Sequence, residues 1–177
     1  APQVWSGIYI YARYASGEYW DDVTYQEGEV VRIFGEGDEY NGLTELNAGN
    51  DVAAFAITRL GYDNAMVAPI SVTTGQLGIA CNMVGEAYEG LMVTLANVEI
   101  QSTPNQYGEI VIDDGSGATQ LEDGLMDTHE HFTTAFCNLT DRAYVGDVMT
   151  TLTGIVRYAW SSYEVYPRSA ADIELPI

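Results

Sequence analysis

The sequence predicts an all-β chain built from two related modules. Short apolar segments with period-two alternation dominate, and Gly, Asp, Asn or Pro residues bound them, as is typical of strands. Helical spacing of apolar residues is scarce. An internal similarity between residues 28–51 and 146–172 indicates that one structural plan occurs twice.

Strands are expected wherever β-branched or aromatic residues form short runs. In chain order these runs cover residues 7–14, 29–37, 90–101, 108–115, 147–160 and 162–167. The one helix pattern lies at residues 127–141, where apolar side chains recur at helical spacing: Phe132, Ala135, Phe136 and Leu139. Its threonines disfavour a long helix, so we expect a short helix or an irregular loop there.

The two similar segments share an order of elements. Each begins with a Gly and an acid and continues with an apolar strand, a second Gly, another strand segment and a polar turn. The two glycines are Gly28 and Gly35 in the first copy and Gly146 and Gly154 in the second, so the spacing differs by one residue.

Module boundaries follow from this comparison. We expect modules at residues 1–62 and 63–177, the second with an insertion near 124–145. In the second module a long strand precedes "GEIVIDDG", whereas its counterpart in the first would lie before Ala1. The first module is therefore expected to lack its opening strand, which a neighbouring chain could supply.

The second half contains "GEAYEGLMVTLANVEI", "GEIVIDDGSG", "VGDVMTTLTGIVRY" and "YEVYPRSAADI". With these segments it resembles the OB-fold-like modules of secreted bacterial proteins, over residues 67–174. Residues 4–47 resemble the later strands of a preceding module, through "SGIYIY" and "EYNGLTEL". The resemblance implies two small Greek-key barrels in tandem, the first incomplete. It implies no catalytic motif, because such modules often serve as accessory or linking domains.

Charge excludes some classes of partner. The chain has 26 Asp plus Glu against six Lys plus Arg, a formal net charge of -20, so it should repel nucleic acid. No run approaches the roughly 18 apolar residues of a membrane helix, and no membrane insertion is expected. The start "APQVW" has neither an initiator Met nor a signal core, so we expect a mature chain, extracellular or at the cell surface.

Two features bear on an oxidising, extracellular compartment. Cys81 and Cys137 are expected to form a disulfide there, and would remain buried thiols in a reducing one. Asn138 begins the sequon "NLT" and is a candidate glycosylation site, although such a short pattern is common by chance.

Two candidate metal sites arise from the sequence. Asp113 and Asp114 of "DDGSG" have oxygen ligands suited to Ca²⁺, but a β-turn is the preferred interpretation, because the other oxygen ligands of a calcium loop are missing. His129 and His131 of "THEH" are candidate transition-metal ligands. They are not neighbours on a helix, and a metal site would need further ligands such as Asp127 or Asp141, so a solvated loop is preferred and no cofactor is expected.

The sequence contains no recognisable catalytic motif. A Ser or Cys nucleophile needs a nearby base, yet both histidines lie in one loop and no "GxSxG" turn occurs. Nothing singles out a catalytic pair among the acids. The chain is therefore expected not to be an enzyme.

Aromatic residues near the N-terminus suggest an interface. Alternation places Tyr9 and Tyr11 on one face of a strand and Ile8 and Ile10 on the other, which would suffice as a core face. The tyrosines and Trp5 are then expected to face outward and to contact a partner.

The chain end offers a second interface through the alternating Ile173, Leu175 and Ile177, which could add a strand to a neighbour. We therefore expect a structural subunit that assembles with copies of itself into an extracellular filament or fibre by donor-strand complementation. The alternative is an accessory OB-like module of a larger secreted enzyme that binds saccharides or single strands on its aromatic face.

Overall fold

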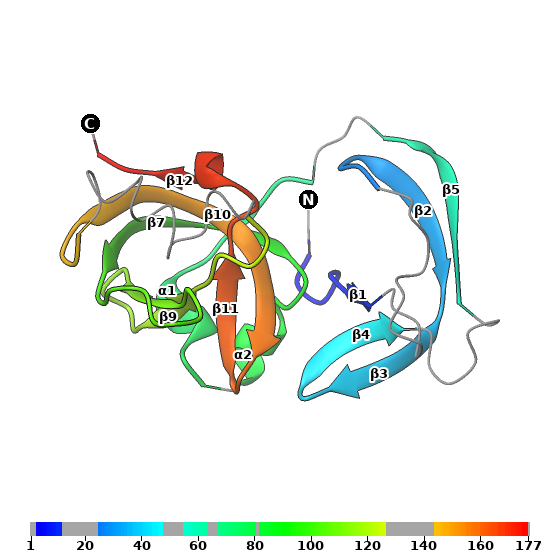
Figure 1. Ribbon diagram of the computed structural model, residues 1–177. Helices are drawn as coiled ribbons and strands as arrows, with labels where there is room; N and C mark the ends of the chain where they lie inside the picture. Colours follow the sequence, from blue (N-terminus) through cyan, green and yellow to red (C-terminus); the bar gives the residue numbers. More distant parts are fainter. Residues whose placement is uncertain are drawn as a thin grey trace. The chain divides into compact units, whose positions relative to one another are not determined.

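The computed structural model describes residues 3–11, 25–47, 55–63, 67–80, 82–126 and 144–176 (Figure 1). The chain divides into two compact units. The N-terminal unit is Ile8–Ala68, and the C-terminal unit combines Ala1–Gly7 with Pro69–Ile177. Strands dominate both, so the predicted all-β class is confirmed.

The N-terminal unit contains two small sheets. In one, β4 (Leu43–Asn47) lies between β1 (Tyr9–Tyr11), its parallel neighbour, and β3 (Glu36–Tyr40), its antiparallel neighbour. The other sheet pairs β2 (Glu29–Phe34) with β5 (Ala56–Tyr62) in antiparallel fashion. These incomplete sheets agree with the predicted incomplete first module.

Gly35 separates two strands that the sequence predicts as one run. A Cβ at Gly35 would lie 2.9 Å from the carbonyl oxygen of Asn47 and 3.0 Å from Cδ2 of Phe55. Only glycine allows the backbone at this position to lie so close to Asn47 and Phe55. At this glycine β2 ends and β3 begins, and the two strands belong to different sheets. The similar Gly154 lies instead within one continuous strand.

The C-terminal unit holds the remaining strands. They are β6 (Ile70–Ser71), β7 (Met92–Ile100), β8 (Ile110–Asp113), β9 (Thr119–Leu121), β10 (Val148–Ala159), β11 (Ser162–Tyr166) and β12 (Ile173–Glu174). Five of them close into a barrel in the order β7, β8, β9, β11, β10 and back to β7. All neighbours are antiparallel except β9 and β11, which run parallel. This closed Greek-key arrangement is compatible with an OB-like fold.

Two one-turn helices and a 3₁₀ turn (Ala170–Asp172) accompany the barrel. Helix α1 (Thr74–Leu77) begins where the Thr73 amide donates to the Gln76 side chain at 2.8 Å. Helix α2 (Met83–Glu86) begins at Asn82, whose Oδ1 accepts from two backbone amides. The sequence does not predict either helix, because one turn is too short for an apolar period. The predicted helix at 127–141 lies outside the described residues.

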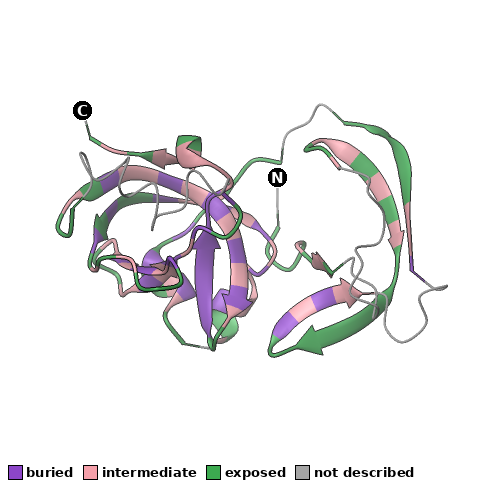
Figure 2. Ribbon diagram, in the orientation of Figure 1, coloured by how far each residue is buried: buried purple, intermediate pink, exposed green. Residues whose placement is uncertain are grey.

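Most buried residues of the C-terminal unit lie on the barrel strands (Figure 2). Alternate residues of β7, β8 and β10 are buried, as their alternation predicts. Strand β11 differs, because every one of its residues is buried. Among the described residues, no helix is long and apolar enough to cross a membrane.

The N-terminal unit buries far less. Among its described apolar side chains only Leu43 and Phe55 are buried, at 4% and 3% exposure. The exposed large apolar side chains of this unit are Ile8, Tyr11, Val30, Phe34, Tyr40, Leu60, Tyr62 and Val67. The expectation that Ile8 faces a core is wrong, since 46% of it is exposed.

Replacement of Gly154 tests the barrel packing. A Cβ there would lie 2.7 Å from Cγ1 of Val165 and 2.8 Å from the backbone of Tyr166. We expect Gly154→Ala to lower the free energy of unfolding by about 1–3 kcal/mol, measured by chemical denaturation. The control is Gly37→Ala, where the added methyl meets no atom within 4 Å. Equal stability of both variants would contradict this packing.

Candidate functional site

The outer face of β11 carries a buried polar cluster. Tyr163 and Val165 face the barrel interior with Val156, whereas Ser162, Glu164 and Tyr166 alternate with them and point outward. Glu164 nevertheless has 0% exposure. A fully buried carboxyl group on the outside of a barrel is unusual, because its charged form loses hydration.

Hydrogen bonds organise this cluster. The Tyr166 hydroxyl donates to Oε2 of Glu164 at 2.8 Å, and the Ser162 hydroxyl donates to Oε1 at 3.3 Å. Ser162 also donates to Oε1 of Gln120 on β9. On the other side, the guanidinium of Arg157 lies 5.6 Å from the centre of the Tyr166 ring. The cluster thus joins three neighbouring strands.

Burial shifts the protonation of these groups. It raises the pKa of Glu164 to about 7, and the charges of Glu109 and Glu122 add to the rise, while the Tyr166 hydrogen bond opposes it. Burial likewise raises the pKa of Glu122, and burial with the charge of Glu164 raises that of Tyr166. Glu164 can therefore hold a proton near neutral pH, but a substrate cannot reach a side chain that is fully buried.

The candidate calcium ligands lie where β8 ends: Asp113 is its last residue and Asp114 begins the turn that follows. Oδ1 of Asp113 accepts from the amides of Gly115 and Gly117, at 2.7 and 3.2 Å. Asp114 accepts from the Thr74 amide at 3.1 Å and the Thr74 hydroxyl at 2.7 Å. Burial opposes ionisation of Asp114, but hydrogen bonds from Ser116 and Thr74 lower its pKa. Asp113 thus closes the turn itself, and Asp114 ties it to α1. No group of three or more metal-binding side chains occurs within the described ranges.

The predicted interface residues lie in both units. In the C-terminal unit Trp5 is 61% exposed, and its amide donates to the carbonyl of Ala87 at 2.9 Å. Tyr9 is half-buried and Tyr11 is exposed on β1. Six of the predicted site residues lie outside the described residues: Cys81, Cys137, His129, His131, Asn138 and Ile177.

The chain end pairs within its own barrel. Ile173 is half-buried and lies opposite Leu152 of β10, and Glu174 lies opposite Thr151. Leu175 follows and is half-buried. A tail that donates to another chain would have to leave this position or extend beyond it.

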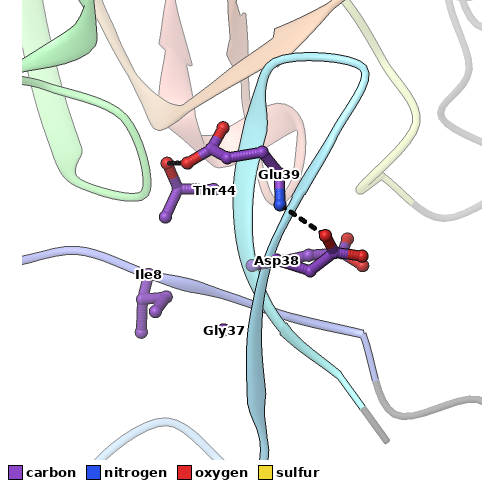
Figure 3. Close-up of a pocket in the computed structure, with 6 residues that line it drawn as sticks. Ile8, Gly37, Asp38, Glu39 and Thr44 are labelled. Atoms are coloured by element: carbon purple, nitrogen blue, oxygen red, sulfur yellow. Dashed lines mark hydrogen bonds between the residues drawn. The ribbon is translucent and has the colours of Figure 1, made fainter. Parts of the chain in front are cut away.

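A shallow depression of about 420 Å³ lies on the β1–β4–β3 sheet (Figure 3). Gly37 forms its floor, because a Cβ there would meet nothing within 4 Å. Ile8 stands on one side and Glu39 on the other, and the Thr44 hydroxyl donates to Glu39 at 2.6 Å. Asp38 also lines the depression, although its side chain points to the opposite face of the sheet (Figure 3). The sequence signal for this site was a Gly between acids within a strand, "EGDE".

A family model described as "Domain of unknown function (DUF8508)" matches residues 84–176, more than half of the chain. The match begins within α2 and includes all five barrel strands. It does not extend to the N-terminal unit. No curated protein and no solved structure matches the chain.

The raised pKa of Glu164 predicts a pH-dependent stability. A carboxyl group whose pKa rises on folding stabilises the protein fully below its unfolded pKa, near 4.5. This contribution is lost as pH rises through about 7. We expect thermal unfolding to show a decrease of roughly 3 kcal/mol between pH 4.5 and 8 that Glu164→Gln removes. Parallel pH profiles of the two proteins would contradict the assignment.

Proposed function

The chain belongs to the family described as a domain of unknown function (DUF8508), and because that description assigns no activity, we propose its function from the two units. It is a structural subunit that assembles with copies of itself into a filament or fibre. The N-terminal unit is the assembly module, and the closed barrel is the scaffold that carries it.

The observation that supports this proposal is the open state of the N-terminal sheets. Within the described residues, β1 and β3 are sheet edges, and β2 and β5 each have one neighbour only. Such edges present backbone N–H and C=O groups that an added strand can pair. The barrel, by contrast, leaves none of its five strands without two neighbours.

Apolar exposure in the same unit supports the same conclusion. Phe34 is 61% exposed, Tyr40 63% and Leu60 53%, on three different strands. Exposed apolar side chains gain free energy when a partner covers them. Assembly would bury these side chains and pair the edges together, which is the physical basis of strand complementation.

The tail remains the proposed donor strand. Two residue pairs with β10 and a hydrogen bond from the Thr150 hydroxyl to the Glu174 carbonyl, at 3.1 Å, attach the tail to its own barrel, which is a short ladder. Assembly would be favoured if the tail left this short pairing and paired instead with a longer edge strand of a neighbouring copy. We also propose an extracellular or cell-surface location, where the net charge of -20 keeps the assemblies dispersed.

Removal of Glu174–Ile177 tests the donor. We expect the full chain to form larger particles as its concentration rises, by light scattering and electron microscopy, and the truncated chain to remain monomeric with its barrel intact. The control Gln106→Glu changes an exposed residue elsewhere in the C-terminal unit. Filaments of normal length from the truncated chain would contradict the tail as donor. A full chain that stays monomeric at all concentrations would contradict the assembly proposal itself.

Trp160 supports a second candidate, an accessory ligand-binding module. This side chain is 87% exposed, in a two-residue turn where Trp160 and Ser161 both have positive φ, 48° and 73°. That turn favours Asn-Gly, so an exposed Trp there occupies an unfavourable conformation. An aromatic ring so displayed can stack on a sugar or a base.

The second candidate predicts a monomer that binds oligosaccharides or single-stranded oligonucleotides. We expect Trp160→Ala to weaken that binding about tenfold in calorimetry, because a stacked ring contributes about 1–3 kcal/mol. Tyr107→Ala, at another exposed aromatic residue, is the control. Equal affinities of the wild type and Trp160→Ala would contradict this candidate.

A further inference from the structure

Arg32 lies on an exposed face of β2. The burial of this strand alternates, and Val30, Arg32 and Phe34 form its exposed face. Val30 is 40% exposed and Phe34 61%. The face therefore presents one guanidinium group between two apolar side chains, a combination enriched in protein interfaces.

The other arginines of the described residues already have partners in their own unit. The chain has six basic residues, all Arg, and Arg13 and Arg142 lie outside the described ranges. The engaged groups are Arg59 with Glu29 at 2.9 Å, Arg168 with Asp172 at 2.7 Å, and Arg157 beside the Tyr166 ring. Within the part of the chain that the structure describes, Arg32 is thus the exposed guanidinium group that is available to another molecule.

The depression over Gly37 has the complementary chemistry. Ile8, which is 46% exposed, forms an apolar wall. Glu39 provides a carboxylate that accepts a hydrogen bond from the Thr44 hydroxyl at 2.6 Å. Gly37 leaves open space between them. A glycine within a strand often marks the place where another chain approaches closely. A side chain with an aliphatic stem and a cationic end fits this arrangement.

We propose that the exposed face of β2 in one copy packs on the β1–β4–β3 sheet of the next copy, with Arg32 over Gly37 and its guanidinium group against Glu39. This inference rests on the proposed self-assembly and specifies its contact. Val30 and Phe34 then cover the neighbour's Ile8. The two surfaces differ, so the contact is heterologous and propagates into a filament unless it closes a ring.

Charge favours this contact between copies. Two copies with a formal net charge of -20 each repel one another, and salt screens this repulsion only partly. An interface that brings a cation of one copy to an anion of the other offsets part of this repulsion. Pairing of Arg32 with Glu39 achieves this and sets the register between copies.

A charge exchange tests the contact in the full chain. We expect Arg32→Glu and Glu39→Arg each to weaken association at least tenfold in concentration-dependent light scattering. The double variant restores the charge pair in reverse and should recover association. Glu36→Arg changes the charge equally on the opposite face of β3, and should leave association at least as strong as in the wild type.

Two further variants separate the contact from general charge and folding effects. Arg32→Gln and Gln106→Glu each make the chain more negative by one charge, and only Arg32→Gln should weaken association. Gly37→Val fills the depression on a strand that tolerates a side chain there, so it should keep the circular dichroism spectrum and lose association.

The outcomes distinguish this inference from the proposal beneath it. A wild-type chain that never associates contradicts both. Association that survives Arg32→Glu and Gly37→Val, in folded protein, contradicts the Arg32 contact alone and leaves self-assembly standing. Failure of the double variant to recover any association, when both single variants fold, also contradicts the pairing of Arg32 with Glu39.

Discussion

The closure of the barrel by β7 and β10 is the constraint on which the C-terminal unit depends. Strand β10 pairs with β7 from Val148 to Ile155 and with β11 from Ile155 to Ala159. This closure satisfies the backbone groups that an open sheet would expose, and it encloses a mainly apolar core. It also positions β11, whose Tyr163 hydroxyl bonds to Glu86 of α2 at 2.5 Å.

The N-terminal unit lacks this closure, and its properties follow from that lack. Two separate sheets bury only Leu43 and Phe55 fully among their described apolar residues, so apolar side chains and edges face outward. Small sheets of this kind are marginal alone and gain stability from additional strands or a second layer. The proposed assembly is one solution to that deficit, because it would provide both from a copy of the same chain.

The acidic composition is accommodated locally by different means. On β3 and β4, Asp38 and Glu45 lie directly opposite, and the Asn47 amide donates to both, at 3.2 and 2.9 Å. Asp114 is stabilised as a carboxylate by hydroxyl and amide donors. Glu164 is instead buried, where protonation relieves the cost of its charge. Each arrangement offsets repulsion that the composition alone would impose.

Sequence by itself determined the all-β class, several of the strands and one turn, but not β5, β6 or β9. Alternation in residues 92–100 and 148–159 specifies strands with one buried face, and Asn41–Gly42 specifies a hairpin turn with positive φ at both positions. Only the tertiary structure decided the parallel pairing of β9 with β11, the burial of Glu164 and the depression over Gly37. A periodic pattern reports which side chains share a face, whereas pairing and cover depend on segments far apart in the chain. Alternation alone would have placed Glu164 in solvent.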